Sequence, residues 1–339
     1  MSLIYLIFTP IIVFFLNKFL KKNKIFYNYS GDSHQKFVGE KFVPLTGGFY
    51  LIIFFSIIMM LNYLVLYFFL ISIFFIGILS DIKFISSPIK RLILQTLLTI
   101  FFIYMLELYV TSTKVILIDE MLANFYFSIF FTSFCLIILM NGSNFIDGLN
   151  GLVLGYYLII LLTLYNLDMF SNFHLSNEFF SYLIYLIIIL LIFNFFNIFY
   201  LGDSGTYLLS CFVGCVLIAI YNQNQIFSPF FVVLLLWYPC FENLFSIIRK
   251  FKIKKSPIDA DSKHLHQLIF YFLKKKFKRN NLITNNCSSI IINLYNLIIF
   301  FTAKSYIHNT QFLIFLLLLN ITVYTFFYVK LFNSKYKID

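Results

Sequence analysis

The sequence predicts an all-α fold, a polytopic transmembrane helix bundle, and three observations support this prediction. Of the 339 residues, 61% are hydrophobic and only 12% are charged, whereas a soluble globular domain carries about 25% charged residues. Apolar runs near the ~20 residues that cross a bilayer as a helix recur along the whole chain. No alternating pattern of ~10-residue segments suggests a β-barrel. Residues 1–339 are therefore expected to form one integral membrane domain.

Charged or turn-rich interruptions divide the chain into about ten to eleven spans. In chain order these are 3–20, 47–61, 64–79, 91–110, 123–140, 150–167, 179–199, 205–222, 229–248, 289–302 and 311–329. The run 47–79 is too long for one crossing, so a turn is expected at Asn62 and Tyr63. The span 289–302 is the weakest, because it is short and contains Asn293 and Asn296.

Lysine and arginine set the expected orientation. If residues 18–46 are cytoplasmic, every lysine and arginine except Lys114 and Lys304 falls on the cytoplasmic side, as the positive-inside rule requires. The N-terminus is then outside and the C-terminus inside. The first span is expected to be a retained helix, because no charged segment precedes it and no small-residue cleavage site follows it.

The net charge of +11 is accounted for by the cytoplasmic loops, so no nucleic-acid partner is expected. Membrane lipids with anionic headgroups and a phosphate-bearing substrate are the expected partners. The five cysteines lie in or near apolar spans without histidine or acidic neighbours, which favours packing over a metal site.

Polar residues concentrate at the cytoplasmic ends of the predicted spans. The segments concerned are 44–48, 80–81, 141–150, 202–205 and 259–266, carried by loops 21–46, 80–90, 141–150, 200–205 and 249–288. Each segment alone could be a helix cap or turn, because Asp, Ser, Asn and Gly cap helices routinely. Their joint occurrence on one side instead predicts a single polar cleft, since carboxylates and amides at a membrane boundary need partners.

Glu242 is an intramembrane carboxylate within the ninth predicted span. It follows Pro239, where a kink is expected. We expect it either to face the cleft or to pair with Asn243 or Arg249, and we assign it no catalytic role.

Five motifs stand out along the chain. They are Asn-x-x-Asn-x-x-Asp-Gly-x-x-Gly-Leu at 141–152, Leu-Gly-Asp-Ser-Gly at 201–205, Pro-x-x-Gly-Gly at 44–48, an acidic residue followed by Ser-Pro-x-x-Lys/Arg and Gln over 81–95, and His-x-His at 264–266. Together they resemble one family, the polyprenyl-phosphate N-acetylhexosamine-1-phosphate transferases. The family includes enzymes that start O-antigen and teichoic-acid synthesis and the phospho-N-acetylmuramoyl-pentapeptide translocase. The resemblance runs from about residue 30 to residue 270, in order and with matching topology.

The resemblance implies that a UDP-N-acetylhexosamine donates its sugar 1-phosphate to polyprenyl phosphate at the cytoplasmic face of the bacterial inner membrane. Joining two anions requires a cation, and Mg²⁺, with Mn²⁺ as an alternative, suits oxygen ligands and phosphates. By resemblance, Asp203 and Asp147 hold the metal, and Asp81 assists the lipid phosphate as base or as nucleophile. A homodimer is left open.

The implied substrate-binding residues are Lys41, Gly47, Gly48, Asn141, Asn144, Asn150, His264 and His266. Asn141 and Asn144 lie three apart, so both amides can face one ligand from a helix end. Asp259 and Asp261 precede the two histidines in a basic loop, which by resemblance reaches back to the donor phosphates.

The sequence departs from the family at three places. Ser80 replaces the first of two adjacent aspartates, Asn150 replaces the second aspartate of its motif, and Gln267 replaces a further histidine. Serine is no base without activation, and asparagine hydrogen-bonds without a charge. A catalytically degenerate scaffold and a membrane transporter are therefore the alternatives to the enzyme. A transporter would place polar groups near the midplane and often shows two related halves, and no internal repeat is evident.

Overall fold

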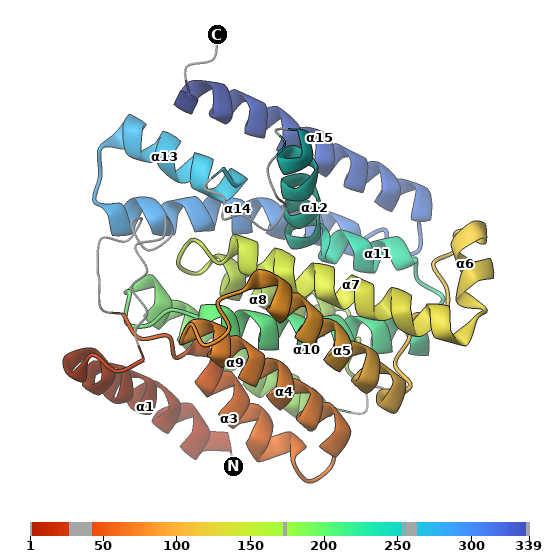
Figure 1. Ribbon diagram of the computed structural model, residues 1–339, viewed down its shortest axis with the longest axis horizontal. Helices are drawn as coiled ribbons and strands as arrows, with labels where there is room; N and C mark the ends of the chain where they lie inside the picture. The colour runs from red at the N-terminus through yellow and green to blue at the C-terminus, as the bar shows by residue number, and fades with distance from the viewer. Residues whose placement is uncertain (1, 27–42, 172–174, 253, 255–262, 337–339) are drawn as a thin grey trace.

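The computed structural model describes residues 2–26, 43–171, 175–252, 254 and 263–336 (Figure 1). In these ranges the chain forms fourteen helices and one isolated β-bridge, and no strand longer than that bridge. The all-α class predicted from the composition is confirmed. Lys41, Asp259 and Asp261 lie outside the described residues.

The helices are α1 (Ser2–Asn23), α3 (Gly47–Met59), α4 (Leu64–Asp81), α5 (Pro88–Leu106), α6 (Ile116–Leu122), α7 (Phe125–Ile146), α8 (Leu152–Asn166), α9 (Asn177–Phe195), α10 (Gly202–Gln223), α11 (Pro229–Leu235), α12 (Trp237–Lys252), α13 (Leu265–Phe277), α14 (Asn281–Lys304) and α15 (Thr310–Tyr336). Each of the eleven predicted spans matches one helix or, for the ninth, the pair α11 and α12. The expected turn at 62–63 separates α3 from α4.

The number of helices that satisfy both length and composition for crossing a membrane is smaller than the eleven expected. Among the described residues seven do so, namely α4, α5, α7, α9, α10, α14 and α15, and the bent pair α11 and α12 would make eight. The apolar helices α3 and α8 have only 13 and 15 residues, below the ~20 that span a bilayer. The weakest predicted span is in fact part of α14, which extends over 24 residues.

Helix α10 is the centre of the bundle. In its apolar window 94% of the residues are buried, against 22% for α5, and it packs against α3, α4 and α7. Small residues permit this packing: a Cβ at Gly77 of α4 would collide with the backbone of Ser204, and a Cβ at Gly48 would lie 2.7 Å from the backbone nitrogen of Gly205. The start of α10 is therefore held against the ends of two other helices.

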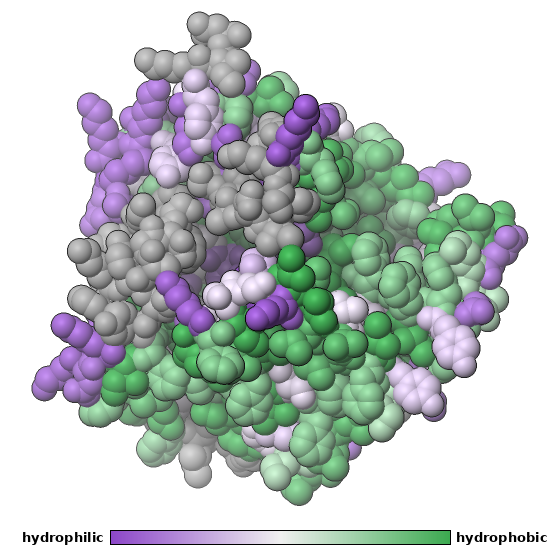
Figure 2. All heavy atoms as spheres, in the orientation of Figure 1, coloured by the Kyte–Doolittle hydropathy of each residue, from purple (hydrophilic) through white to green (hydrophobic). Residues whose placement is uncertain are grey.

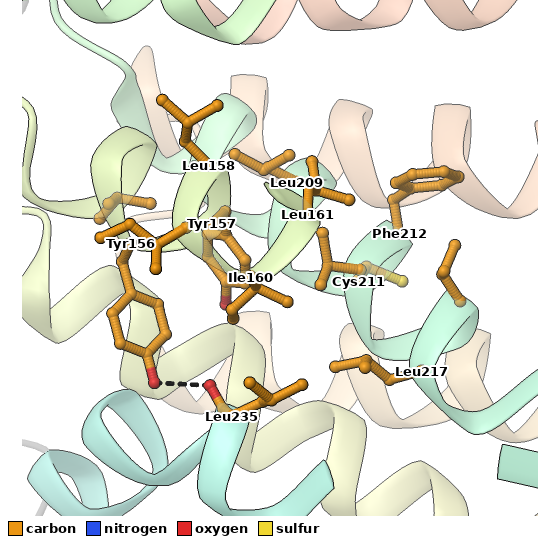
Figure 3. Packing of buried hydrophobic residues seen from close by; sticks show 14 of the residues in the cluster. Tyr156, Tyr157, Leu158, Ile160, Leu161, Leu209, Cys211, Phe212, Leu217 and Leu235 are labelled. Atoms are coloured by element: carbon orange, nitrogen blue, oxygen red, sulfur yellow. Dashed lines mark hydrogen bonds between the residues drawn. The ribbon is translucent and has the colours of Figure 1, made fainter. Parts of the chain in front are cut away.

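Large apolar side chains of α8 and α10 fill the interior between these helices (Figure 3). Tyr156 and Tyr157 are fully buried, and the Tyr156 hydroxyl donates a 2.7 Å hydrogen bond to the Leu235 carbonyl. That carbonyl belongs to the last residue of α11, and the helix is interrupted at Leu236 before α12 begins. The tyrosine thus satisfies a backbone group that the break leaves exposed to an apolar interior.

The ninth predicted span is broken. Helices α11 and α12 meet at Leu236 with an angle of 71° between them. The bend comes before Pro239 rather than at it, because Leu236 already ends α11 and Pro239 lies in the first turn of α12, where proline is tolerated. The bend directs α12 away from α11 in Figure 1.

The predicted motif at 44–48 meets the predicted motif at 201–205 through backbone contacts. Leu45 and Tyr200 form a parallel bridge, in which the Tyr200 nitrogen donates to the Pro44 carbonyl at 2.9 Å and the Gly47 nitrogen donates to the Tyr200 carbonyl at 3.2 Å. The start of α3 is thereby joined to the start of α10, although some 150 residues separate them in the sequence.

The surface divides as a membrane protein requires. Figure 2 shows hydrophobic side chains over the middle of the molecule and hydrophilic ones gathered beside α13. The exposed apolar residues include Leu97 and Phe101 on α5, which are 60% and 52% exposed. The end of α13 and the chain after it carry Lys275, Lys276 and Arg279, all exposed. Apolar exposure of this extent suits lipid rather than water.

Candidate active site

Asp81 closes the N-terminus of α10. Its Oδ1 accepts from the Asp203 nitrogen at 2.8 Å and its Oδ2 accepts from the Ser204 nitrogen at 3.1 Å. Gly202 makes this possible, because its φ is +75° and a Cβ there would lie 2.9 Å from the Asp81 Oδ2. The first N–H groups of a helix have no partner within the helix and carry partial positive charge. Asp81 therefore has a structural role that the sequence did not predict, while its catalytic role stays a prediction.

Asp203 faces a serine and an arginine. Its Oδ2 accepts from the Arg91 Nη1 at 2.8 Å and from the Ser80 Oγ at 2.5 Å, and the same Arg91 nitrogen also reaches the Ser80 oxygen at 2.5 Å. The arginine and aspartate side chains are 22% and 24% exposed. The site thus contains a fixed positive charge beside the carboxylate predicted to hold metal, at the edge of the solvent-accessible surface.

Arg91 and Gln95 were missing from the predicted site, although their motif was recognised. Both lie on α5, one turn apart, and each contacts a predicted site residue. Arg91 pairs with Asp203, and the Gln95 Oε1 accepts from the Asn141 Nδ2 at 3.0 Å. Polar residues four apart on an otherwise apolar helix share one face. That spacing was the signal that could have identified them.

Asp147 lies at the end of α7, half-buried. The Thr206 hydroxyl donates to its Oδ2 at 3.0 Å. Loss of solvent raises the pKa of the Asp147 carboxyl well above its usual range; the Thr206 hydrogen bond opposes this shift, and the charges of Asp203 and Asp81 add to it. The three predicted carboxylates therefore influence one another across the start of α10, and a cation between them would relieve the repulsion.

The two predicted substrate-orienting asparagines lie on the same side of α7 as Asp147. Asn141 contacts Gln95, as described above, and the Asn144 Nδ2 donates to the Tyr207 hydroxyl at 2.8 Å. The side chains of Asn141 and Asn144 are half-buried. Asn144 lies about one helical turn before Asp147, and Asn141 nearly two turns before it.

The turn after Asp147 is held by asparagines from two other helices. The Asn150 nitrogen donates to the Asn285 Oδ1 at 2.7 Å, and the Gly151 nitrogen donates to the Asn194 Oδ1 at 2.5 Å. Asn293 donates to the Gly151 carbonyl at 3.0 Å. These three asparagines, called the clamp residues below, were not predicted. Buried amides need hydrogen-bond partners, but the sequence does not show which backbone groups they meet.

The predicted substrate residue Asn150 is itself buried, at 4% exposed. Gly47 and Gly48 are buried too, against Leu201 and Ser204. Substrate binding by these three residues stays a prediction, and the structure shows them in packing and turn positions.

The histidine motif at the start of α13 lies over the Asp147 turn. Both histidines are buried, and their rings are nearly parallel, with centroids 5.6 Å apart. A Cβ at Gly148 would lie 2.5 Å from the His266 Nε2, so glycine next to Asp147 allows the ring to approach the backbone. The segments 141–150 and 264–266 are thereby brought together, as the one-cleft prediction required.

Glu242 pairs with a residue that was not expected. Its Oε1 lies 2.9 Å from the His264 Nδ1, and the two side chains are 0% and 6% exposed. The Asn243 amide instead contacts the Ile138 carbonyl, and Arg249 contacts Lys263 and Tyr328. The expected pairing of Glu242 with Asn243 or Arg249 is thus replaced by a pairing with the histidine motif.

The predicted magnesium site would be an open one, completed by substrate and water rather than by protein alone. Within the described part of the chain no group of three or more His, Cys, Asp or Glu side chains has an arrangement that could hold a metal by itself. Magnesium commonly uses one or two carboxylates together with substrate phosphates and water. Asp147 and Asp203 supply two such carboxylates, one of them in a desolvated position that a cation would stabilise.

A helical membrane bundle that gathers carboxylates, an arginine and two histidines at one end defines an enzyme of the membrane with a site for charged substrates. The family model of glycosyl transferase family 4 matches residues 63–221 of this chain. That segment runs from α4 to α10 and contains Asp81, Asp147 and Asp203. The family resemblance seen in the motifs is confirmed.

One relative supports the same resemblance. The undecaprenyl-phosphate alpha-N-acetylglucosaminyl 1-phosphate transferase of Thermotoga maritima is 25% identical over 232 residues, which cover 68% of this chain and 69% of that protein.

We expect Asn285→Ala to weaken the clamp on the Asp147 turn. The substitution leaves the buried Asn150 N–H without its acceptor, which costs about 1–3 kcal/mol of unfolding free energy. Unfolding of the purified protein in detergent measures this loss. Cys287→Ala, on the exposed side of the same helix, is the control and should change stability by less than about 0.5 kcal/mol. Equal stability of both variants would show that the clamp contributes nothing.

Proposed function

We propose that the chain transfers an N-acetylhexosamine 1-phosphate from a UDP-sugar to undecaprenyl phosphate, or a similar polyprenyl phosphate, and so starts a lipid-linked glycan of the O-antigen, lipopolysaccharide or a related type. The observation that carries this proposal is the convergence of Asp81, Asp147 and Asp203 beside Arg91 at the start of α10. The match to the family model and the name of the Thermotoga relative support it.

In this reaction an oxygen of the lipid phosphate forms a bond to the sugar-linked phosphorus of the donor, and the bond from that phosphorus to the UMP oxygen breaks. Two anions must approach each other, so the residues at the site have to supply positive charge and fixed hydrogen-bond donors. Arg91 provides the charge next to Asp203. Asn141 and Asn144 provide amides on the neighbouring helix end, and His264 and His266 cover the Asp147 turn where the donor phosphates are proposed to lie.

Asp203 and Asp147 are the proposed ligands of Mg²⁺, with Mn²⁺ as an alternative. When bound, the metal would neutralise phosphate charge in the reaction. Asp81 is the proposed base or nucleophile for the lipid phosphate. Because both its oxygens accept backbone hydrogen bonds from α10, acting on a substrate would require it to exchange one of these bonds.

An assay of UMP release tests the reaction. Purified protein with polyprenyl phosphate and Mg²⁺ should release UMP from at least one of the donors UDP-GlcNAc, UDP-GalNAc and a UDP-linked deoxy-HexNAc, and should form the lipid diphosphate sugar. Release of UMP without polyprenyl phosphate should be absent. Protein that binds these UDP-sugars and forms no product with any of them would support the non-catalytic scaffold instead.

Asp203→Asn should lower turnover by about 10²-fold or more, because it keeps the shape of the side chain and removes the charge used at a phosphoryl-transfer site. The measurement is the initial rate of UMP release across a range of Mg²⁺ concentrations. Asp168→Asn, an exposed aspartate outside the cluster, is the matched control and should leave the rate unchanged. Normal turnover of Asp203→Asn at all Mg²⁺ concentrations would contradict the assignment.

The proposed site lies on the cytoplasmic side of the bacterial inner membrane, as the distribution of lysine and arginine indicates. Cysteines placed at the exposed residues Lys114 and Lys275, in a Cys287→Ser background, test this orientation. A membrane-impermeant thiol reagent should label position 114 in intact cells and label both positions in lysed membranes. Labelling of position 275 in intact cells would place the site on the opposite side.

A further inference from the structure

Glu242 lies in α12, which packs against α7, the helix that ends just before Asp147. The Glu242 side chain is fully buried. Helices α7 and α12 are in close contact because Gly142 lies directly on the backbone carbonyl of Pro239, where a Cβ would collide. A glutamate in this position would be costly unless it had a partner of complementary charge or hydrogen bonding. His264 is that partner, with 2.9 Å between the Oε1 and the Nδ1.

His264 is the residue that starts α13. Its backbone has extended angles, and the Gln267 side chain accepts from its nitrogen in a capping box. The same capping box directs the His264 side chain toward the backbone nitrogen of Gln267. Contacts from other helices add to this restraint on the imidazole.

Among the described residues, three side chains contact the His264 ring. The Glu242 carboxylate meets its Nδ1, Phe145 of α7 lies 5.4 Å away between ring centroids, and His266 stacks on it at an interplanar angle of 11°. Of these contacts, the one with Glu242 joins a ring nitrogen to a side chain of another helix. An ionised carboxylate accepts and does not donate, so it pairs with the histidine tautomer that carries a proton on Nδ1.

The ring contacts extend to the turn. His266, stacked on His264, lies against Gly148, the residue after Asp147. A change in the orientation of His264 therefore moves the second histidine relative to the carboxylate turn. The path from Glu242 to the Asp147 turn contains one hydrogen bond, one ring stack and the close approach of His266 to Gly148, and the glutamate and both histidines are buried.

We propose that Glu242 is a positioning residue for the nucleotide-sugar site: its carboxylate sets the orientation and the protonated nitrogen of His264, and through the stacked rings it fixes the histidine pair over the Asp147 turn. The proposal rests on the proposed function, in which these histidines meet the donor phosphates. Glu242 acts through His264 and does not itself contact the substrate.

A double-substitution cycle on the full-length protein tests this proposal. The variants are Glu242→Ala, Glu242→Gln, His264→Ala and the double variant with both alanines, with the exposed Glu120→Ala of α6 as a control at the far end of the molecule (Figure 1). Initial rates of UMP release give kcat and the KM values for the UDP-sugar and for polyprenyl phosphate separately.

Glu242→Ala should raise the KM for the UDP-sugar about tenfold and change the KM for polyprenyl phosphate less than about twofold, since only the donor site loses its orientation. Glu242→Gln keeps an oxygen that accepts from Nδ1 and should recover most of the lost donor affinity. In the His264→Ala background, Glu242→Ala should add less than about a twofold further effect, because the two residues act as one unit.

Other outcomes overturn the proposal. Multiplicative effects of the two alanine substitutions would show that Glu242 acts independently of His264. A fall in kcat with unchanged KM values, not recovered by Glu242→Gln, would show a purely structural role. If the wild type released no UMP from any donor, the proposed function would fail, and the same cycle would be measured on binding of the UDP-sugar. Wild-type protein that bound no UDP-sugar would overturn both proposals.

Discussion

The start of a buried helix is the constraint on which the rest of this structure depends. Helix α10 is enclosed by other helices, and its own N-cap position offers no side-chain hydrogen bond. The first N–H groups of such a helix cannot turn to water, so another element must satisfy them. Asp81 does so from the end of α4. Asp81, the Arg91–Asp203 ion pair and Asp147 consequently lie together at the start of α10. Such a concentration of polar groups is suited to charged ligands.

Asparagine amides have a similar function on the other side of the site. The chain between α7 and α8 must turn inside the bundle, where each backbone group needs a partner. Asn194 of α9 and Asn285 and Asn293 of α14 supply donors and acceptors for this turn. A side-chain amide is well suited to the task because it carries both functions without charge. The carboxylate of Asp147 is thus carried on a turn that α9 and α14 hold together.

Much of this arrangement was predictable from the sequence, and the limits of prediction have physical causes. Composition and apolar run length gave the class of fold, and motif order with charge asymmetry gave the common face of Asp147, Asp203 and His266. Partners could not be predicted, because Glu242 had neighbours in the sequence that were chemically as suitable as His264, which lies 22 residues away. Asp81 was expected to serve catalysis alone, since a sequence does not reveal which helix end lies near a carboxylate. Helix lengths were overestimated for α3 and α8, where apolar composition continues into turns.

The polar face of α14 also bears on how the chain enters the membrane. Among the seven long apolar helices of the described residues, α14 has the lowest mean hydropathy, 1.4 against 2.3 for α4. Its polar residues include Asn285, Ser288, Ser289, Asn293 and Asn296, and all five are buried. An isolated helix with these amides would partition poorly into lipid. The turn at 150–151 and Trp237 of α12, which carry the partner groups of these amides, are synthesised earlier. A late helix with weak affinity for lipid therefore meets a prepared protein surface, and its integration is a docking step between helices as much as a transfer into the bilayer.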